Sequence, residues 1–175
     1  MMKYRFILIL LCIFTSTLFS SEPVSIDNWM NNKDISKIRE IYKQVQSSRY
    51  DRAKKIFNTN STKCSTYPIK EKSILVDNSG VIRKLSVTQL ISHREPLLIE
   101  RYYDSSGVIR FIFTKSLISE IRIYLNDTGD VIWAVTKDNS KFSKADYTNS
   151  DWETKPSRSK DAKLFYNESE KCPSL

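Results

Sequence analysis

The sequence predicts an α+β fold in which an N-terminal amphipathic helix packs on an antiparallel β-meander of about six strands. Two patterns support this fold. Apolar residues recur at helical spacing over residues 34–57, and turns that begin with Asp or Asn and end in glycine separate β-branched runs over residues 67–137. Residues 138–175 form a polar tail. We therefore expect a single α+β domain, residues 21–175, after an N-terminal segment of a different kind.

Residues 34–57 form the predicted helix. Their apolar side chains are spaced three and four residues apart, with lysines and arginines between them, which is typical of a helix with one buried face. Asp34 can cap the N-terminus, because a carboxylate there accepts hydrogen bonds from the exposed first-turn amides. Ser47 and Ser48 interrupt the pattern and can divide the helix in two. The apolar positions are Ile35, Ile38, Ile41, Tyr42, Val45, Ala53, Ile56 and Phe57.

The chain contains three glycines, and each closes a similar four-residue turn. Asp or Asn at the first position and glycine at the fourth favour a type I turn, in which the glycine adopts a positive φ and forms a bulge. The turns begin at Asp77, Asp104 and Asn126. They end at Gly80, Gly107 and Gly129. Apolar runs flank each turn, so the sequence predicts three β-hairpins.

The meander follows from these hairpins and from the polar turns that join one hairpin to the next. The amphipathic helix is expected to cover the apolar face of this sheet. Within the polar tail, residues 162–166 can add an edge strand. The predicted strands span 69–76, 81–91, 97–103, 108–114, 118–125 and 131–136.

Residues 1–20 have the layout of a secretory signal peptide. Lys3 and Arg5 form a positive segment, residues 6–14 are continuously apolar, and small residues follow before the polar Ser21. The apolar stretch is shorter than the roughly 20 residues that a membrane-spanning helix needs. We therefore expect a cleaved signal and a secreted or periplasmic mature protein without a membrane span. A retained membrane anchor is the alternative.

Cys64 and Cys172 are the cysteines left after removal of the signal, because Cys12 lies within it. An even number of cysteines in an oxidising compartment predicts one disulfide, which would fasten the C-terminal tail to the domain. An intermolecular bridge or two free thiols are the alternatives. These cysteines and the single histidine, His93, do not make a zinc site, so we expect no metal and no cofactor.

The sequence lacks the short motifs of common enzyme classes, such as a nucleophile elbow, a phosphate-binding loop or a metalloprotease helix. This favours an exported, non-enzymatic binding or interaction domain. A small secreted hydrolase or toxin-like enzyme that uses carboxylates in a groove is one alternative. A catalytic dyad, with Cys64 as the thiol and His93 as its partner, is another enzymatic possibility, although the predicted disulfide would use the same cysteine. A structural protein of the bacterial envelope is another alternative.

The formal net charge of the chain is +8 and falls to +6 when Lys3 and Arg5 leave with the signal. A basic exported protein is attracted to negative charge, so the expected partners are an anionic surface, a polysaccharide or another protein. The basic residues are scattered among acidic ones, and ordinary solubilising charge is the alternative interpretation. Export makes nucleic acid an unexpected partner, and the sequence leaves the oligomeric state open.

The alternation of the strands also predicts a binding surface. Phe111, Ile123 and Trp133 are expected to face the helix, which leaves a patch of charged and tyrosine side chains on the opposite face of the sheet. Arginines in such a patch can bind carboxylate or sulfate groups, and tyrosines add rigid contact area. A solvated sheet face whose Arg–Glu pairs balance their charges is the alternative. The expected patch consists of Arg110, Glu120, Arg122 and Tyr124, joined by Glu100 and Tyr102.

Overall fold

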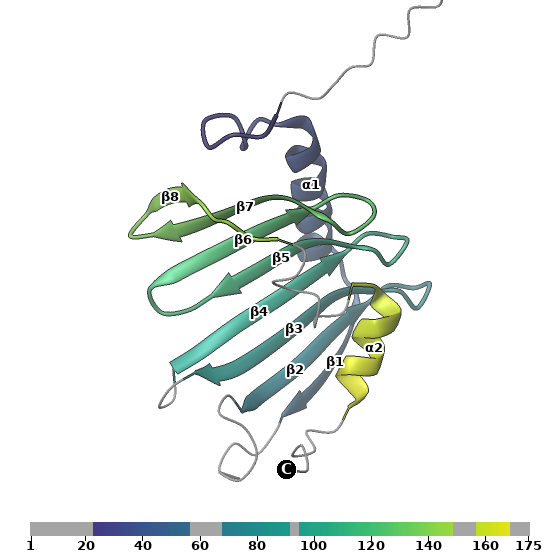
Figure 1. Ribbon diagram of the computed structural model, residues 1–175. Coiled ribbons are helices and arrows are strands. Elements are labelled where there is room, and N and C mark those ends of the chain that lie inside the picture. The colour runs from purple at the N-terminus through teal and green to yellow at the C-terminus, as the bar shows by residue number, and fades with distance from the viewer. Residues whose placement is uncertain (1–22, 57–67, 92–94, 149–156, 169–175) are drawn as a thin grey trace, which may run out of the picture.

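Eight antiparallel strands form one sheet in chain order, and a helix lies on each face of it (Figure 1). The computed structural model describes residues 23–56, 68–91, 95–148 and 157–168. The predicted α+β class and antiparallel meander are confirmed, but the sheet has eight strands rather than six. None of the described helices has the length and hydropathy to cross a membrane. The elements are α1 (Lys33–Ser47), β1 (Asp51–Ile56), β2 (Ile69–Val76), β3 (Ile82–Ile91), β4 (Glu95–Tyr103), β5 (Ile109–Lys115), β6 (Ser119–Leu125), β7 (Val131–Asp138), β8 (Lys141–Lys144) and α2 (Ser159–Asn167).

Helix α1 is shorter than predicted. It ends at Ser47, and residues 51–56 form β1, which pairs along its whole length with β2. The prediction of helix over 34–57 was wrong in this part, because pairing with a neighbouring strand outweighs a weak local preference. The N-cap is Asn32 rather than Asp34. The Asn32 side chain accepts hydrogen bonds from the backbone N–H groups two and three residues later, at 3.0 and 3.3 Å.

The C-terminal part of the described chain also differs from the predicted polar tail. Strand β8 follows a two-residue turn in which Asn139 and Ser140 have positive φ values of 46° and 73°. The polar residues 137–140 predict a turn here, but the short, mostly polar run after it was not predicted as a strand. Residues 162–166 were predicted as an edge strand but lie in helix α2. Ala162 and Tyr166 are both buried there, because residues four apart lie on the same face of a helix.

Two lysines of the sheet hold the C-terminal end of α2. Lys72 Nζ donates a hydrogen bond to the Phe165 carbonyl at 3.0 Å, and Lys55 Nζ donates one to the Tyr166 carbonyl at 2.9 Å. The last carbonyls of a helix have no partner within the helix and carry partial negative charge, so ammonium groups stabilise them. These bonds fix α2 over β2 and β3.

The three glycine turns are built alike. In each, the side-chain oxygen of the first residue accepts hydrogen bonds from the backbone N–H groups two and four residues later. The φ values of 80°, 78° and 92° belong to Gly80, Gly107 and Gly129. Only glycine adopts this left-handed conformation without strain. A β-bulge lies beside each turn and shifts the strand register at Leu75, Tyr102 and Tyr124.

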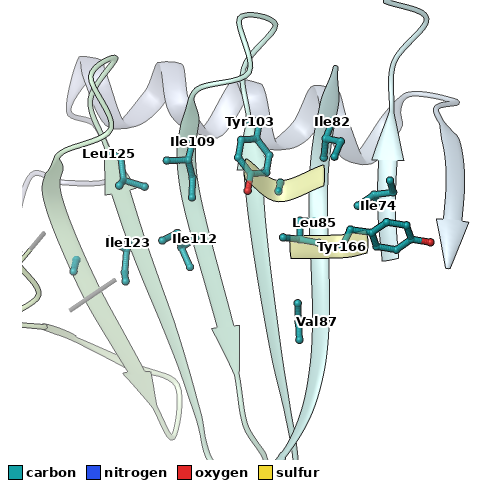
Figure 2. Packing of buried hydrophobic residues seen from close by; sticks show 12 residues of the cluster. Ile74, Ile82, Leu85, Val87, Tyr103, Ile109, Ile112, Ile123, Leu125 and Tyr166 are labelled. Atoms are coloured by element: carbon teal, nitrogen blue, oxygen red, sulfur yellow. The ribbon is translucent and has the colours of Figure 1, made fainter. Parts of the chain in front are cut away.

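Both faces of the sheet are buried, one under each helix. On the α2 face, Ile112 and Ile123 lie side by side on neighbouring strands (Figure 2). The α1 face carries a second core that contains Phe111 and Trp133. The prediction that Ile123 shares a face with these two aromatic residues was therefore wrong. Tyr124 is the residue opposite Phe111, and alternation did not fix this register because apolar residues occupy both faces of the strands.

Candidate functional site

A groove lies between α1 and strands β5 and β6, on the face of the sheet that α1 covers. Its cavity volume is about 360 Å³, which is within the ordinary range for small-molecule sites. Side chains from these three elements line it, and we call it the α1 groove. The lining residues are Arg39, Tyr42, Lys43, Phe111, Phe113, Glu120, Arg122 and Tyr124.

Helix α1 presents Arg39, Tyr42 and Lys43 to the groove. These residues are three and four positions apart, so they lie on one side of the helix. The side chains that hold the helix on the sheet are Ile35, Ile38 and Val45. The groove therefore runs beside the contact line of the helix, where polar side chains meet the sheet.

The two strands supply alternate residues to the same side of the groove, because side chains of paired strands alternate between the two faces of a sheet. The cross-strand pairs on this face are Phe111–Tyr124, Phe113–Arg122 and Lys115–Glu120. Phe111 and Tyr124 are only 6% and 2% exposed. One end of the groove is therefore aromatic and deep, and the end toward the β5–β6 turn is charged.

Aromatic rings form the deep end. The ring centroids of Phe111 and Tyr124 are 5.0 Å apart, and those of Tyr42 and Phe111 are 5.5 Å apart. The ring centroids of Tyr42 and Tyr102 are 5.0 Å apart, and those of Trp29 and Tyr124 are 5.9 Å apart. Tilted and edge-on contacts of this kind are favourable, and they hold the rings in fixed positions. The deep end is thus a rigid apolar surface.

Glu120 is the carboxylate among the lining residues. It accepts a hydrogen bond from Arg122 Nη2 at 3.1 Å, and its other oxygen lies 3.6 Å from Lys115 Nζ. Burial acts to raise the pKa of Glu120, but the hydrogen bond from Arg122 and the charges of Arg122, Lys137 and Lys115 outweigh it. The pKa therefore lies below its ordinary value. Glu120 is ionised at neutral pH, and neighbouring cations balance its charge.

Cationic side chains outnumber carboxylates in the groove. Burial raises the pKa of Tyr124, whereas the charges of Arg122 and Arg39, which also line the groove, act to lower it. Arg39 also donates to a backbone carbonyl of the segment before α1 at 3.0 Å. Lys43 pairs with Glu40 at 2.8 Å on the exposed side of the helix. The groove therefore combines rigid aromatic rings with an excess of positive charge.

A polar network beside the groove joins the end of α1 to the sheet. Tyr102 Oη donates to Glu100 at 2.6 Å and accepts a hydrogen bond from Gln46 Nε2 at 2.7 Å. Lys84 Nζ lies 2.5 Å from the other Glu100 oxygen. Burial, followed by the charge of Glu100, raises the pKa of Tyr102, so its hydroxyl stays protonated. Through Gln46 and Tyr102, this network ties the C-terminal end of α1 to β4 and so helps to position the helix.

The structure brings most of the predicted patch together, but on the face that α1 covers rather than on the opposite one. The cause is the same register difference that places Ile123 under α2. Arg110 lies apart from the others, because it pairs with Asp104 at 3.3 Å and donates to the Leu125 carbonyl at 3.3 Å. Of the predicted residues, Glu120, Arg122 and Tyr124 line the groove, and Glu100 and Tyr102 form the adjoining network.

The helix side of the groove was not among the predicted site residues. Arg39, Tyr42 and Lys43 carry a signal that was available in the sequence, because two basic residues and an aromatic one share one flank of an amphipathic helix. That pattern is also typical of an ordinary solvated helix flank. Only the position of the helix over β5 and β6 distinguishes the two interpretations.

Cys64, Cys172 and His93 lie outside the described residues, as does the predicted signal peptide. The part of the chain that the structure describes contains no group of three or more His, Cys, Asp or Glu side chains that could hold a metal ion. No protein-family model, curated protein or solved structure matches the chain. Function is therefore inferred from the geometry and charge of the α1 groove.

Proposed function

We propose that the chain is an exported, non-enzymatic binding domain that takes an anionic ligand in the α1 groove. The observation that carries this proposal is the combination of Arg39, Lys43 and Arg122 with a rigid aromatic floor, against the single lining carboxylate Glu120. The inference of export is based on residues 1–20, which have the layout of a signal peptide. The basic net charge, +8 for the full chain and +6 without Lys3 and Arg5, favours encounter with negatively charged partners.

The chemistry of the groove favours a ligand with a carboxylate or sulfate group and an apolar face. A guanidinium group binds such anions through two parallel hydrogen bonds, and here Arg122 and Arg39 line the groove from its two sides, the sheet and the helix. The rings of Phe111 and Tyr42 meet edge to face at 78° and supply an apolar corner against which a ring of the ligand can pack. An acidic sugar unit of a cell-surface polysaccharide has both features.

The hydrolase alternative needs two carboxylates that act together. Glu100 and Glu120 lie on the same face, and the strand register puts their Cα atoms about 12 Å apart. Glu100 pairs with Lys84, whereas Glu120 pairs with Arg122, so the two carboxylates turn toward different cations. A glycosidase acid also needs a raised pKa, and that of Glu120 is lowered. These features favour binding over hydrolysis.

Arginine side-chain NMR tests the proposal directly. Titration with glucuronate should shift the Nε–Hε signals of Arg39 and Arg122 in a saturable manner, and neutral glucose should not. Arg122→Ala removes a charge-assisted contact, so we expect it to weaken glucuronate binding by about ten-fold.

Arg52→Ala is the matched control, because Arg52 is an exposed arginine on β1 and its loss changes the net charge equally. It should leave glucuronate affinity unchanged. Equal weakening by Arg52→Ala and Arg122→Ala would show non-specific attraction and contradict a site in the groove. An absence of saturable shifts with glucuronate, and with a sulfated disaccharide as second probe, would reject the proposed ligand class.

A further inference from the structure

The turn between β5 and β6 exposes two adjacent aliphatic side chains. Leu117 is 71% exposed and Ile118 is 83% exposed. The turn is ordered by hydrogen bonds: Ser116 N–H donates to the Ser119 carbonyl at 2.9 Å, and Ser116 Oγ accepts from the Ile118 and Ser119 N–H groups at 3.3 and 3.1 Å. The two side chains therefore project from a fixed tip, which we call the apolar tip.

Basic residues surround the apolar tip. Ser119 lies opposite Asp138 in the sheet, so the β5–β6 and β7–β8 turns are neighbours at the same end of the sheet (Figure 1). Lysines outnumber carboxylates around these two turns. The lysines are Lys115, Lys137 and Lys141, and the carboxylates are Glu120 and Asp138. This end of the sheet thus combines exposed apolar side chains with a small excess of positive charge.

We propose that this end of the sheet docks on an anionic lipid bilayer, with Leu117 and Ile118 inserted at the boundary between headgroups and acyl chains. A stable protein interface needs about 800 Å² on each partner, which a two-residue tip does not supply. The other exposed large apolar side chains of the described residues lie on other elements and do not extend the tip into a patch. A bilayer accepts protruding apolar side chains without a complementary pocket.

Charge gives the docking its lipid preference. Each basic group near an anionic membrane surface strengthens binding by about five-fold, so the net excess at this end favours anionic over neutral lipid. Two aliphatic side chains are enough for weak, reversible binding. The inference uses residues other than those that line the deep end of the α1 groove, and it stands or falls separately from the ligand proposed there.

Co-sedimentation with large unilamellar vesicles tests this docking. The exported form of the protein, as recovered from cells, should bind vesicles of phosphatidylcholine mixed with phosphatidylglycerol and bind pure phosphatidylcholine vesicles more weakly. Leu117→Ser combined with Ile118→Ser should weaken binding to the mixed vesicles by about ten-fold, because burial of two aliphatic side chains is lost. Both residues are exposed, so the thermal unfolding midpoint should not change.

Leu164→Ser is the matched control, because Leu164 is a 59% exposed leucine on α2. It should bind the mixed vesicles like the parent protein. Parent-like vesicle binding by the tip variant would overturn the proposal, and so would equal loss in the tip variant and the Leu164→Ser control. Loss of cell-surface binding in the tip variant with vesicle binding intact would overturn it in favour of a protein partner. Arg39→Ala, which removes a groove cation on α1, should weaken glucuronate binding and leave vesicle binding unchanged, which separates the two proposals.

Discussion

Arg101 is a buried cation whose replacement should make the protein more stable. Its side chain is 4% exposed, and its Nε and Nη1 atoms have no hydrogen-bond partner among the described residues. Burial lowers its pKa, which shows that the environment disfavours the charge. Two contacts of the described residues favour the charge: the ring of Phe165 lies 5.7 Å from the guanidinium carbon, and Tyr103 acts to raise the pKa of Arg101. Buried cations normally have bonded partners, so Arg101 is an energetic weakness in the core under α2.

The expected gain from Arg101→Met follows from these contacts. Each unsatisfied N–H group costs about 1–3 kcal/mol, and loss of the cation–π contact with Phe165 costs about 1–2 kcal/mol. Methionine has a similar length and no donors, so the core keeps most of its packing. We expect a net rise in the free energy of unfolding of about 1–3 kcal/mol. Urea denaturation should show a higher midpoint with an unchanged slope.

Arg83→Met is the control with the opposite expected sign. Arg83 is 5% exposed, but its Nε donates to the Tyr103 carbonyl at 3.1 Å and its Nη1 lies 3.4 Å from Asp77. Its removal takes a charged donor from the Tyr103 carbonyl and from the Asp77 carboxylate, which keeps only its backbone N–H bonds, so the protein should lose about 3 kcal/mol. If Arg101→Met destabilises the protein as Arg83→Met does, the assignment of Arg101 as an unpartnered cation is refuted.

Two further predictions concern a turn and the charged end of the groove. Gly107→Ala should destabilise the protein more than Gly80→Ala in urea denaturation. Both glycines have positive φ, so both substitutions strain the backbone. A Cβ at Gly107 would also lie 2.5 Å from Ser159 Oγ, whereas a Cβ at Gly80 would meet nothing within 4 Å. Equal losses would argue against close packing of α2 on this turn. Because the folded pKa of Glu120 is lowered, its ionised form stabilises the fold above the unfolded pKa of about 4.3, and this contribution is lost as the pH falls through the folded pKa. Glu120→Gln should therefore flatten the fall in stability between about pH 5 and pH 3, and an unchanged profile would contradict the ion pair with Arg122.

The hairpins were predictable because their turns are determined locally. An Asp or Asn at the first position and a glycine at the fourth are enough to form the hydrogen bonds and the positive φ of the turn at Gly80, and the same holds at Gly107 and Gly129. The turn before β8, at Asn139 and Ser140, was also expected from its polar residues, although it contains no glycine. Strand β8 was not predicted, because its four residues are mostly polar and exposed and carry no strand pattern of their own.

The extent of the N-terminal helix was not predictable from its own residues. Ala53 and Ile56 fit the helical spacing, yet the segment pairs with β2 residue by residue. The pattern of a short apolar segment is compatible with either period, and the neighbouring strand decides between them. Residues 162–166 show the opposite case, since they were predicted as a strand and form a helix. Lys72 and Lys55 stabilise that helix by donating hydrogen bonds to its last carbonyls.

The candidate site was predicted in its chemistry but not in its position. Charged and tyrosine residues of β4 and β6 do share one face, as their alternation indicates. Which face that is depends on the register between strands and on a second helix that buries the other side, and neither is encoded in one strand. Arg110 was misplaced for a further reason, because the bulge beside Gly107 takes it out of simple alternation.

The α1 groove exists because Arg122 and Tyr124 lie on the face of the sheet that α1 covers. Had Arg122 and Tyr124 faced solvent, their charges and rings would have formed an open sheet surface. Under α1, the bulky rings of the sheet meet a helix that is attached mainly along its line of isoleucine and valine side chains. Gln46 fixes the C-terminal end of that helix through Tyr102, and Asn32 caps its other end. Because both ends of α1 are fixed, the groove beside its contact line is lined by rings and cations in set positions, and a ligand that enters it meets a preformed site rather than one that must be ordered on binding.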